Sequence, residues 1–492
     1  MRDQLQHLNG TSSLPRGLNS PAKSAGLMFL VVVLAGVLLA LPSINVPFFW
    51  DDLHLIRVQT PAQLAAGWTG TFDSDHIETA GFRPLTNYFN HLRALAFGDS
   101  TTAHRLFLLI LFGIFLALVG VLAHWFFDGG LAQLVLGGLL ALFHVYSVYH
   151  YFWISDGIHL LTGICMLAAI LSFLETLRSG RAAWLLLSAL CTALALLTRE
   201  DALGLYPLLL YLGVGLVWLR RGKQGSLGKL KPALAVFAAL MLLELAAYWY
   251  WRSQLLPDAA PLRFDLLALA WAVGLTVQNA GGSQILNMPW PAYGLVLLVW
   301  NVWLAAFLLL ALLALKRPAR WAALFWAGAA LIGMLPVLVV ARANLLLFPV
   351  AFWGLLVAKV LTEAWKRAGR AWLRGFVVVM TAVALAAPAY ASFAFERELR
   401  PNNVDWMCRN AALLYGVMGK ATVAPDVRAS VQWDLSAYGI TDLSTFESRL
   451  PALERKAHAD GRYGFNAQGL PFIPRFQFLP QLGLHPHCEP PG

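Results

Sequence analysis

Long apolar segments recur along most of the chain and constrain its fold more than any other feature. Hydrophobic residues make up 59% of the 492 residues and charged residues only 13%, whereas a soluble domain has about 25% charged residues. The sequence therefore predicts an all-α polytopic membrane protein. A crossing helix needs about 20 apolar residues, and on that measure about eleven crossings are expected, at residues 26–43, 105–126, 131–149, 157–175, 183–198, 202–219, 232–250, 291–315, 321–340, 344–361 and 374–391.

Lys and Arg are concentrated in alternate loops between these segments, which is typical of loops that face the cytoplasm. The apolar stretch at residues 266–280 is only about 22 Å long as a helix, and counting it as a crossing would place Lys316 outside. It is therefore predicted to be re-entrant or to lie along the surface. With the N-terminus in the cytoplasm, the inner loops carry Arg178, Arg181, Arg220, Arg221, Lys223, Lys229, Lys231, Lys316, Arg317, Arg320, Lys366, Arg367, Arg370 and Arg374.

This topology divides the chain into a cytoplasmic leader at residues 1–24, a transmembrane domain at 25–391 and a small extracytoplasmic C-terminal domain at 392–492. The first outer loop covers residues 44–104. The expected location is the cell (inner) membrane, crossed many times, with the N-terminus in the cytoplasm.

The distribution of charge and the spacing of the cysteines argue against a nucleic-acid-binding protein and against a zinc or redox protein. The net charge of +10 is distributed between the apolar segments rather than gathered on one domain, so it serves membrane topology and no nucleic-acid partner is expected. The 4 cysteines lack the spacing of zinc or redox motifs. Cys408 and Cys488 lie in the C-terminal domain, where an extracytoplasmic location permits a disulfide.

Two adjacent carboxylates, Asp51 and Asp52, follow the first apolar segment. A charged group near the bilayer costs free energy, so its default interpretation is functional. Aspartate is also a good N-cap residue, and on this stretch alone both interpretations stay open.

Most other polar residues near the membrane also fall on the outer side. Within residues 81–97 the apolar residues recur with helical periodicity opposite a polar face, which predicts an amphipathic helix in the interface with Pro84 in its first turn. Each group also has a non-functional explanation. The amphipathic helix could simply anchor the chain in the interface, and the residues around His150 could belong to an aromatic belt. Glu200 could be favoured only by its place at a helix start, and the Arg342 side chain could extend to the interface without binding anything. The outer group comprises Asp51, Asp52, His54, Arg57, Arg83, Asn87, Asn90, His91, Arg93, His144, His150, Asp156, His159, Arg199, Glu200, Asp201, Arg342 and Asn344.

Several of these stretches together resemble a known family. Over residues 26–360 the chain is similar to the GT-C fold glycosyltransferases that use polyprenyl-phosphate-linked sugars, and most to the O-mannosyltransferase-like branch (TMTC, PMT and ArnT type). It departs from that pattern at Val145, where the family has Pro, at Ala341, where it has Glu, and in lacking a repeat array. The resemblance is carried by Asp51-Asp52, by Phe82-Arg83-Pro84-Leu85-Thr86-Asn87, by Phe97-Gly98 with His104, by Phe143-His144, His150 and Trp153-Ile154-Ser155, and by Thr198-Arg199-Glu200.

The resemblance implies transfer of a sugar from a polyprenyl-phosphate donor to an extracytoplasmic hydroxyl of a protein, glycan or lipid, with inversion as the expected stereochemical course. It implies that Asp51 is the base and Asp52 supports it. Cations that stabilise the leaving phosphate are expected at Arg342, Arg199 and Arg83. No cofactor is required, and a divalent metal is compatible but not supported. The remaining substrate-binding candidates are His54, Asn87, His91, His150, Asp156 and Glu200.

Other functions stay open at this point. A lipid-linked glycan transporter or flippase should show inverted halves and ionisable groups near the bilayer midplane, whereas here the polar groups gather on one side. A non-catalytic assembly subunit would keep the helices without needing the acid pair. A ligase that transfers a whole glycan is the related enzymatic alternative.

Overall fold

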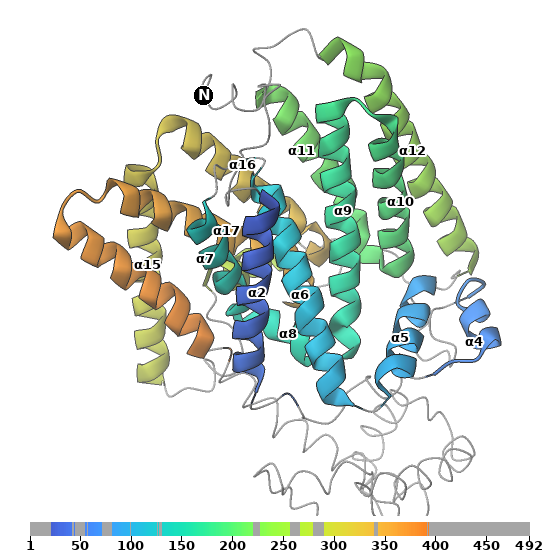
Figure 1. The fold of residues 1–492 in the computed structure, drawn as a ribbon, viewed down its shortest axis with the longest axis horizontal. Helices are drawn as coiled ribbons and strands as arrows, with labels where there is room; N and C mark the ends of the chain where they lie inside the picture. The colour runs from blue at the N-terminus through green and yellow to red at the C-terminus, as the bar shows by residue number, and fades with distance from the viewer. Residues whose placement is uncertain are drawn as a thin grey trace, which may run out of the picture.

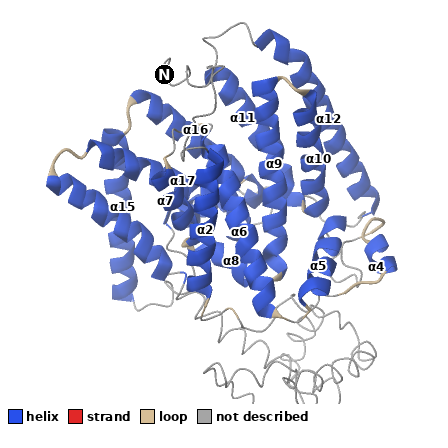
Figure 2. Cartoon of the chain, viewed as in Figure 1, coloured by secondary structure: helices blue, strands red, loops and turns tan. Residues whose placement is uncertain are grey.

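The computed structural model of the protein is built from helices, and the described residues contain no strand (Figures 1 and 2). The all-α prediction is therefore confirmed for this part of the chain. Several predicted features lie outside the described residues: Asp51, Asp52, His54, Arg57, Arg342, the first 20 residues of the leader, Cys408 and Cys488. The structure describes residues 21–41, 44, 55–56, 58–70, 81–98, 100–124, 126, 130–219, 227–255, 266–278, 290–338, 343–390 and 392.

A helix lies at every range where a crossing is expected. The bounds are α2 (Pro21–Ala40), α4 (Pro61–Ala66), α5 (Pro84–Phe97), α6 (Thr101–His124), α7 (Leu131–Leu142), η1 (Val145–Ser147), α8 (Val148–Phe152), η2 (Ser155–Gly157), α9 (Ile158–Ser179), α10 (Ala182–Thr198), η3 (Glu200–Gly204), α11 (Leu205–Leu219), α12 (Leu227–Leu255), α13 (Leu266–Gln278), α15 (Trp290–Ala314), α16 (Arg317–Gly333), η4 (Leu335–Leu338), η5 (Ala343–Leu346), α17 (Leu347–Arg367) and a last helix, Ala371–Tyr390.

Long apolar helices make the chain a multi-pass membrane protein. Within the described residues, 6 helices are long and apolar enough to cross a membrane, or 7 if the bent pair around residue 143 counts as one span. A total of about eleven crossings stays a prediction. The spans of sufficient length are Lys23–Ala40, Thr101–His124, Ser155–Ser179, Ala319–Leu338, Leu347–Arg367 and Ala371–Tyr390.

The segment expected to cross as one helix at residues 131–149 is instead bent. Helix α7 ends at Leu142, and the following pair of short helices turns away by 72°. The His144 side chain accepts a hydrogen bond from the Tyr146 backbone N–H, and the Ser147 hydroxyl donates to the carbonyl of Ala141. The two side chains form hydrogen bonds to backbone groups that would bond to other backbone groups in a continuous helix, so the helix ends here.

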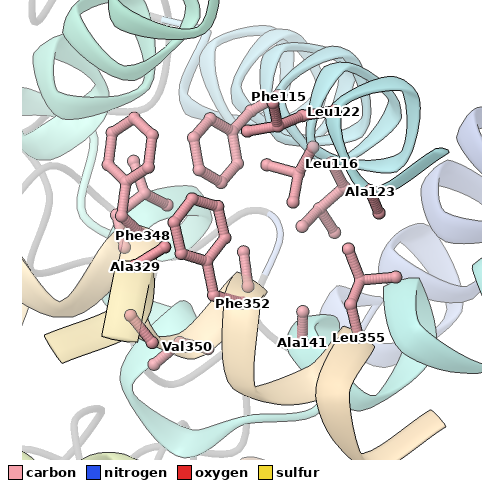
Figure 3. Packing of buried hydrophobic residues seen from close by; sticks show 14 of the residues in the cluster. Phe115, Leu116, Leu122, Ala123, Ala141, Ala329, Phe348, Val350, Phe352 and Leu355 are labelled. Atoms are coloured by element: carbon pink, nitrogen blue, oxygen red, sulfur yellow. The ribbon is translucent and has the colours of Figure 1, made fainter. Parts of the chain in front are cut away.

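Large apolar side chains and close backbone contacts hold the bundle together. Helix α9 packs against α10, α7 against α17, and α2 against α6. Between α6 and α17 the rings of Phe115 and Phe348 meet edge to face with centroids 5.2 Å apart (Figure 3). At the α7–α17 contact, a Cβ added at Gly354 would lie 2.8 Å from the Gly137 carbonyl oxygen. Only glycine permits so close an approach, as is usual for helix pairs in membranes.

Helix α5 is the predicted amphipathic helix, and Pro84 occupies its first turn as expected. Its polar residues Thr86 and Asn90 are buried, whereas Leu92 and Leu95 are 61% and 58% exposed. This arrangement directs the apolar face outward, as in helices whose apolar side contacts lipid. Its position in the interface stays a prediction.

Helix α13 corresponds to the apolar stretch that is too short to cross. Its first residues are exposed, and its last turn contacts the core, where Thr276 is buried and its carbonyl lies 3.2 Å from His144 Nε2. Helix α13 also packs against α15, α17, η4 and η5.

Candidate active site

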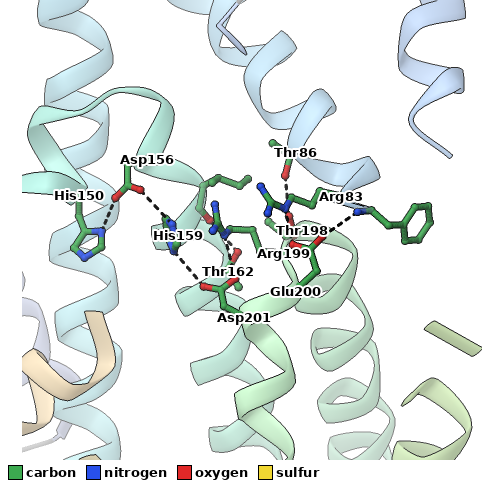
Figure 4. Close-up of polar contacts among 12 residues, drawn as sticks. Arg83, Thr86, His150, Asp156, His159, Thr162, Thr198, Arg199, Glu200 and Asp201 are labelled. Carbon is green, nitrogen blue, oxygen red and sulfur yellow. Dashed lines mark hydrogen bonds and ion pairs between the residues drawn. The ribbon is translucent and has the colours of Figure 1, made fainter. Parts of the chain in front are cut away.

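Polar side chains from distant parts of the sequence meet near one end of the bundle (Figure 4), where α10 contacts α5 and η3 and where η2 contacts α8 and α9. The start of α9 and the end of α10 lie at the same end. Part of the predicted outer group is thus found together: Arg83 with Glu200, and His150, Asp156 and His159 with Arg199 and Asp201. Which side of the membrane this end faces stays a prediction.

The first contact joins the segment before α5 to the start of η3. Arg83 Nε lies 2.5 Å from Glu200 Oε2, and the other carboxylate oxygen accepts a hydrogen bond of 2.9 Å from the Phe82 backbone N–H. One turn along α5, the Thr86 hydroxyl donates to the Thr198 carbonyl at 2.8 Å. These bonds fix the N-terminus of α5 against the end of α10.

A second set of side chains forms a chain of alternating acid and base. Asp156 Oδ2 lies 3.0 Å from His150 Nδ1, and Asp156 Oδ1 lies 3.2 Å from His159 Nε2. The other ring nitrogen, His159 Nδ1, lies 3.1 Å from Asp201 Oδ2, and Arg199 Nε donates to Asp201 Oδ1 at 3.0 Å (Figure 4). These five side chains are called the His150–Arg199 chain below.

His159 is therefore held between two carboxylates. An ionised carboxylate can only accept hydrogen bonds, so a ring with both nitrogens facing carboxylates is suited to carry both protons. The histidine then supplies a positive charge between Asp156 and Asp201. Asp156 lies in η2 and His159, three residues further on, lies in the first turn of α9, so both side chains lie on one face of this turn.

The electrostatics of Asp201 follow from the same contacts. Burial opposes its charged form, but the Arg199 guanidinium and His159 beside it together hold the pKa of the Asp201 carboxyl well below its usual range. Glu200 and Asp201 also lie in the first turn of η3, where acidic residues are favoured. Glu200 and Asp201 therefore fit both the interpretation as helix-end charges and the interpretation as site residues, because each lies at a helix start and each also pairs with an arginine.

Arg199 differs from the other arginines at this end in how its donors are used. A guanidinium has five N–H donors, and among the described residues Arg199 bonds only through Nε, to Asp201. Arg93 donates to the Ile154 carbonyl at 3.0 Å, and Arg105 donates to the Phe152 carbonyl at 3.0 Å. Arg93 and Arg105 thus hold the turn that carries Asp156, whereas the terminal nitrogens of Arg199 bond to none of the described residues.

A small cavity adjoins the chain of polar groups. Its volume is about 20 Å³, which is enough for one water molecule. Polar lining comes from His159, Thr162 and Asp201, and apolar lining comes from α9, α11, the η4 region and α17, including Pro336 and Phe348.

The structure brings some predicted site residues together and separates others. Arg83 pairs with Glu200, and His150, Asp156 and Arg199 belong to the chain described above. His91 lies apart and accepts a hydrogen bond from the Gln59 backbone N–H at 2.9 Å. The buried Nδ2 of Asn87 has no hydrogen-bond partner among the described residues. The predicted residues Asp51, Asp52, His54 and Arg342 are not among the described residues.

Two members of the polar cluster were not among the predicted site residues, although both were sorted to the outer side. His159 and Asp201 are 42 positions apart in the sequence, so no local pattern joins them. Arg105 was not among the predicted residues, because it stands at the start of an apolar segment, where a basic residue usually only fixes the end of the helix at the membrane surface. Its position inside that segment is the signal that could have identified it, since buried charge in a membrane helix is costly.

No group of three or more His, Cys, Asp or Glu side chains that could hold a metal ion occurs in the described part of the chain. The His150–Arg199 chain is linear and its groups do not converge on one point. A metal is therefore not assigned to it.

No family model and no curated protein matches this chain. Among solved structures, the chain is similar to the crystal structure of ArnT from Cupriavidus metallidurans in the apo state. The two are 18% identical, the match covers 92% of this chain and 84% of that chain, and the TM-score is 0.47. At so low a TM-score and identity the similarity assigns neither a family nor an activity to this chain.

Proposed function

We propose that this protein is a GT-C type membrane glycosyltransferase that transfers a sugar from a polyprenyl-phosphate donor to an extracytoplasmic hydroxyl. The observation that carries the proposal is Arg199, which is fixed through Nε by Asp201 and keeps its terminal nitrogens free of the described residues. A guanidinium held in this way suits bidentate contact with phosphate oxygens. The multi-pass bundle supports a substrate with a lipid tail.

The proposed reaction is a single displacement. The acceptor hydroxyl oxygen bonds to the anomeric carbon of the sugar, the bond from that carbon to the phosphate oxygen breaks, and the electron pair leaves with the polyprenyl phosphate. Asp51 takes the hydroxyl proton, as a base within hydrogen-bond reach must do, and Asp52 supports it. Arg199, with Arg83 and Arg342 as further candidates, stabilises the negative charge that gathers on the phosphate. The displacement inverts the anomeric configuration.

The remaining residues of the proposed site bind the sugar or the acceptor. Asn87 suits this role because its side-chain N–H donors are unused among the described residues. His54, His91, His150, Asp156 and Glu200 stay candidates. The scheme needs no metal, and its acceptor is a glycan, a lipid or a protein. The proposed location is the cell membrane, with the site on the extracytoplasmic side.

Sugar transfer in isolated membranes tests the proposal. Labelled polyprenyl-phosphate sugars are supplied to membranes that contain equal amounts of the wild type, Asp51→Asn or Glu175→Gln. Glu175 is the matched control because its carboxylate pairs with Arg178 at the other end of α9. The expected result is transfer by the wild type and by Glu175→Gln and loss in Asp51→Asn.

Two outcomes would contradict the proposal. Equal transfer by the wild type and Asp51→Asn would remove Asp51 from catalysis. If no donor is consumed but the intact lipid-linked sugar changes leaflet, the protein is a transporter.

A further inference from the structure

The His150–Arg199 chain joins the start of α9 to the start of η3 through alternating charges. With both ring nitrogens of His159 protonated, as its two carboxylate neighbours favour, the signs from Asp156 to Arg199 are negative, positive, negative and positive. The side chains of Asp156 and His159 are each 2% exposed. Charges so well buried depend strongly on their partners, because removing one partner leaves the other uncompensated.

Asp201 stands between the two positive groups and shares its oxygens between them. His159 Nδ1 occupies Oδ2, and Arg199 Nε occupies Oδ1. This division limits Arg199 to a single-nitrogen contact with the carboxylate. If Oδ2 became free, Arg199 could use the bidentate arrangement that arginine and carboxylate favour, and one terminal nitrogen would turn toward Asp201.

We propose that His159 is a positioning residue: by occupying Asp201 Oδ2, it keeps the terminal nitrogens of Arg199 directed to the anionic phosphate of a lipid-linked ligand. This inference rests on the proposed function for the identity of the ligand. His159 itself contacts no substrate in this scheme and acts through Asp201. Asp156 lies at the opposite edge of the imidazole, 3.2 Å from Nε2, and thereby helps to fix the orientation of the ring.

The test uses the purified full chain in detergent, with farnesyl phosphate as a probe that carries an isoprenoid and a phosphate but no sugar. Its binding is measured by isothermal titration calorimetry for the wild type, His159→Phe, Asp201→Asn and the double variant. Phenylalanine keeps a ring of similar size and removes both N–H donors. Thr176→Val is the control because Thr176 is also buried on α9, and the hydrogen bond that its hydroxyl makes among the described residues stays within that helix, to the Ser172 carbonyl.

Loss of one charged hydrogen bond to the phosphate predicts binding about tenfold weaker in His159→Phe. Thr176→Val should bind as the wild type does. Because His159 acts through Asp201, adding His159→Phe to Asp201→Asn should weaken binding little further. A role in fold stability alone would instead lower the melting temperature of His159→Phe and leave the binding constant of the folded protein unchanged. In sugar transfer, His159→Phe should lower kcat as well as raise KM for the donor, because Arg199 both binds the phosphate and stabilises the charge that gathers on it as the bond breaks.

Unchanged binding in folded His159→Phe, or multiplying effects in the double variant, would overturn the inference. If His159→Phe does not fold, His159→Leu also removes both ring N–H donors and should weaken binding to the same extent; unchanged binding there overturns it equally. A wild type that binds farnesyl phosphate but transfers no sugar would contradict the proposed function and leave the positioning role standing. A wild type that transfers sugar with full activity in His159→Phe would do the reverse.

Discussion

Replacement of Arg105 by methionine is expected to destabilise the end of the bundle that carries the candidate site. The Arg105 side chain is 1% exposed at the start of α6. Its Nε donates to the Phe152 carbonyl at 3.0 Å and one terminal nitrogen donates to the Ile44 carbonyl at 3.1 Å. The guanidinium also lies 4.9 Å from the centroid of the Phe152 ring. Arg105 thus joins the chain segment after α2 to the end of α8.

The magnitude follows from these contacts. Each hydrogen bond from a charged donor contributes about 1.5–3 kcal/mol, and the ring contact adds about 1 kcal/mol or more when desolvated. Methionine also relieves the cost of burying a guanidinium, which offsets part of this sum. The net loss of unfolding free energy expected for Arg105→Met is therefore about 2–4 kcal/mol. Arg105→Lys keeps the charge but loses the fork that reaches both carbonyls, so its loss should be smaller.

Thermal unfolding of the purified protein in one detergent, followed by tryptophan fluorescence, measures this effect. Arg178→Met serves as the control because the Arg178 side chain is 55% exposed, and exposed ion pairs contribute about 0–1 kcal/mol. The melting temperatures should fall in the order Arg178→Met, Arg105→Lys, Arg105→Met. If Arg105→Met melts together with Arg178→Met, the bonds to the two carbonyls do not stabilise the fold and the reasoning is refuted.

Three further predictions concern other contacts. Gly354→Ala should lower the melting temperature through a loss of about 1–3 kcal/mol, because the new methyl group meets the α7 backbone; an unchanged melting temperature would show that α7 and α17 do not approach so closely. Glu200→Gln should destabilise the protein by about 1–2 kcal/mol, since it weakens the bond to Arg83, and a double-mutant cycle with Arg83→Met should show coupling; additive effects would contradict the pairing. The folded pKa of Asp201 is lowered, so its charge stabilises the fold above the unfolded value of about 3.9, and that contribution is lost as pH falls from there toward the folded pKa. Asp201→Asn should therefore melt at a temperature that falls less steeply below about pH 4, and an identical slope in the two proteins would refute this assignment.

The sequence was sufficient to predict the elements that depend on local pattern. Periodic apolar residues and Pro84 predicted α5, and long apolar runs predicted helices that the structure contains. The number of crossings could not be fixed in the same way, because apolar length does not distinguish a straight span from a bent one. The bend after Leu142 depends on hydrogen bonds between the backbone and the side chains of His144 and Ser147. These bonds replace those of a straight helix, which the apolar composition of the segment favours.

The candidate site was predictable in part. Arg83, Arg199 and Glu200 were identified from their place beside the membrane segments, and the structure adds the partners of each. The pairing of His159 with Asp201 depends on α9 and α10 packing side by side, which no periodicity reveals. The structure separates two arginines of this end by their contacts: Arg105 donates to backbone carbonyls, whereas among the described residues the terminal nitrogens of Arg199 have no partner.

The most direct test of the proposed glycosyltransferase is the stoichiometry of its reaction in proteoliposomes. The purified wild type is given one labelled polyprenyl-phosphate sugar and an acceptor, and the released polyprenyl phosphate is counted against the sugar transferred. The proposal predicts one polyprenyl phosphate for each sugar transferred, with inverted anomeric configuration, and no release from Asp51→Asn. Release that is unchanged in Asp51→Asn, or disappearance of the donor from one leaflet without any bond broken, would contradict it.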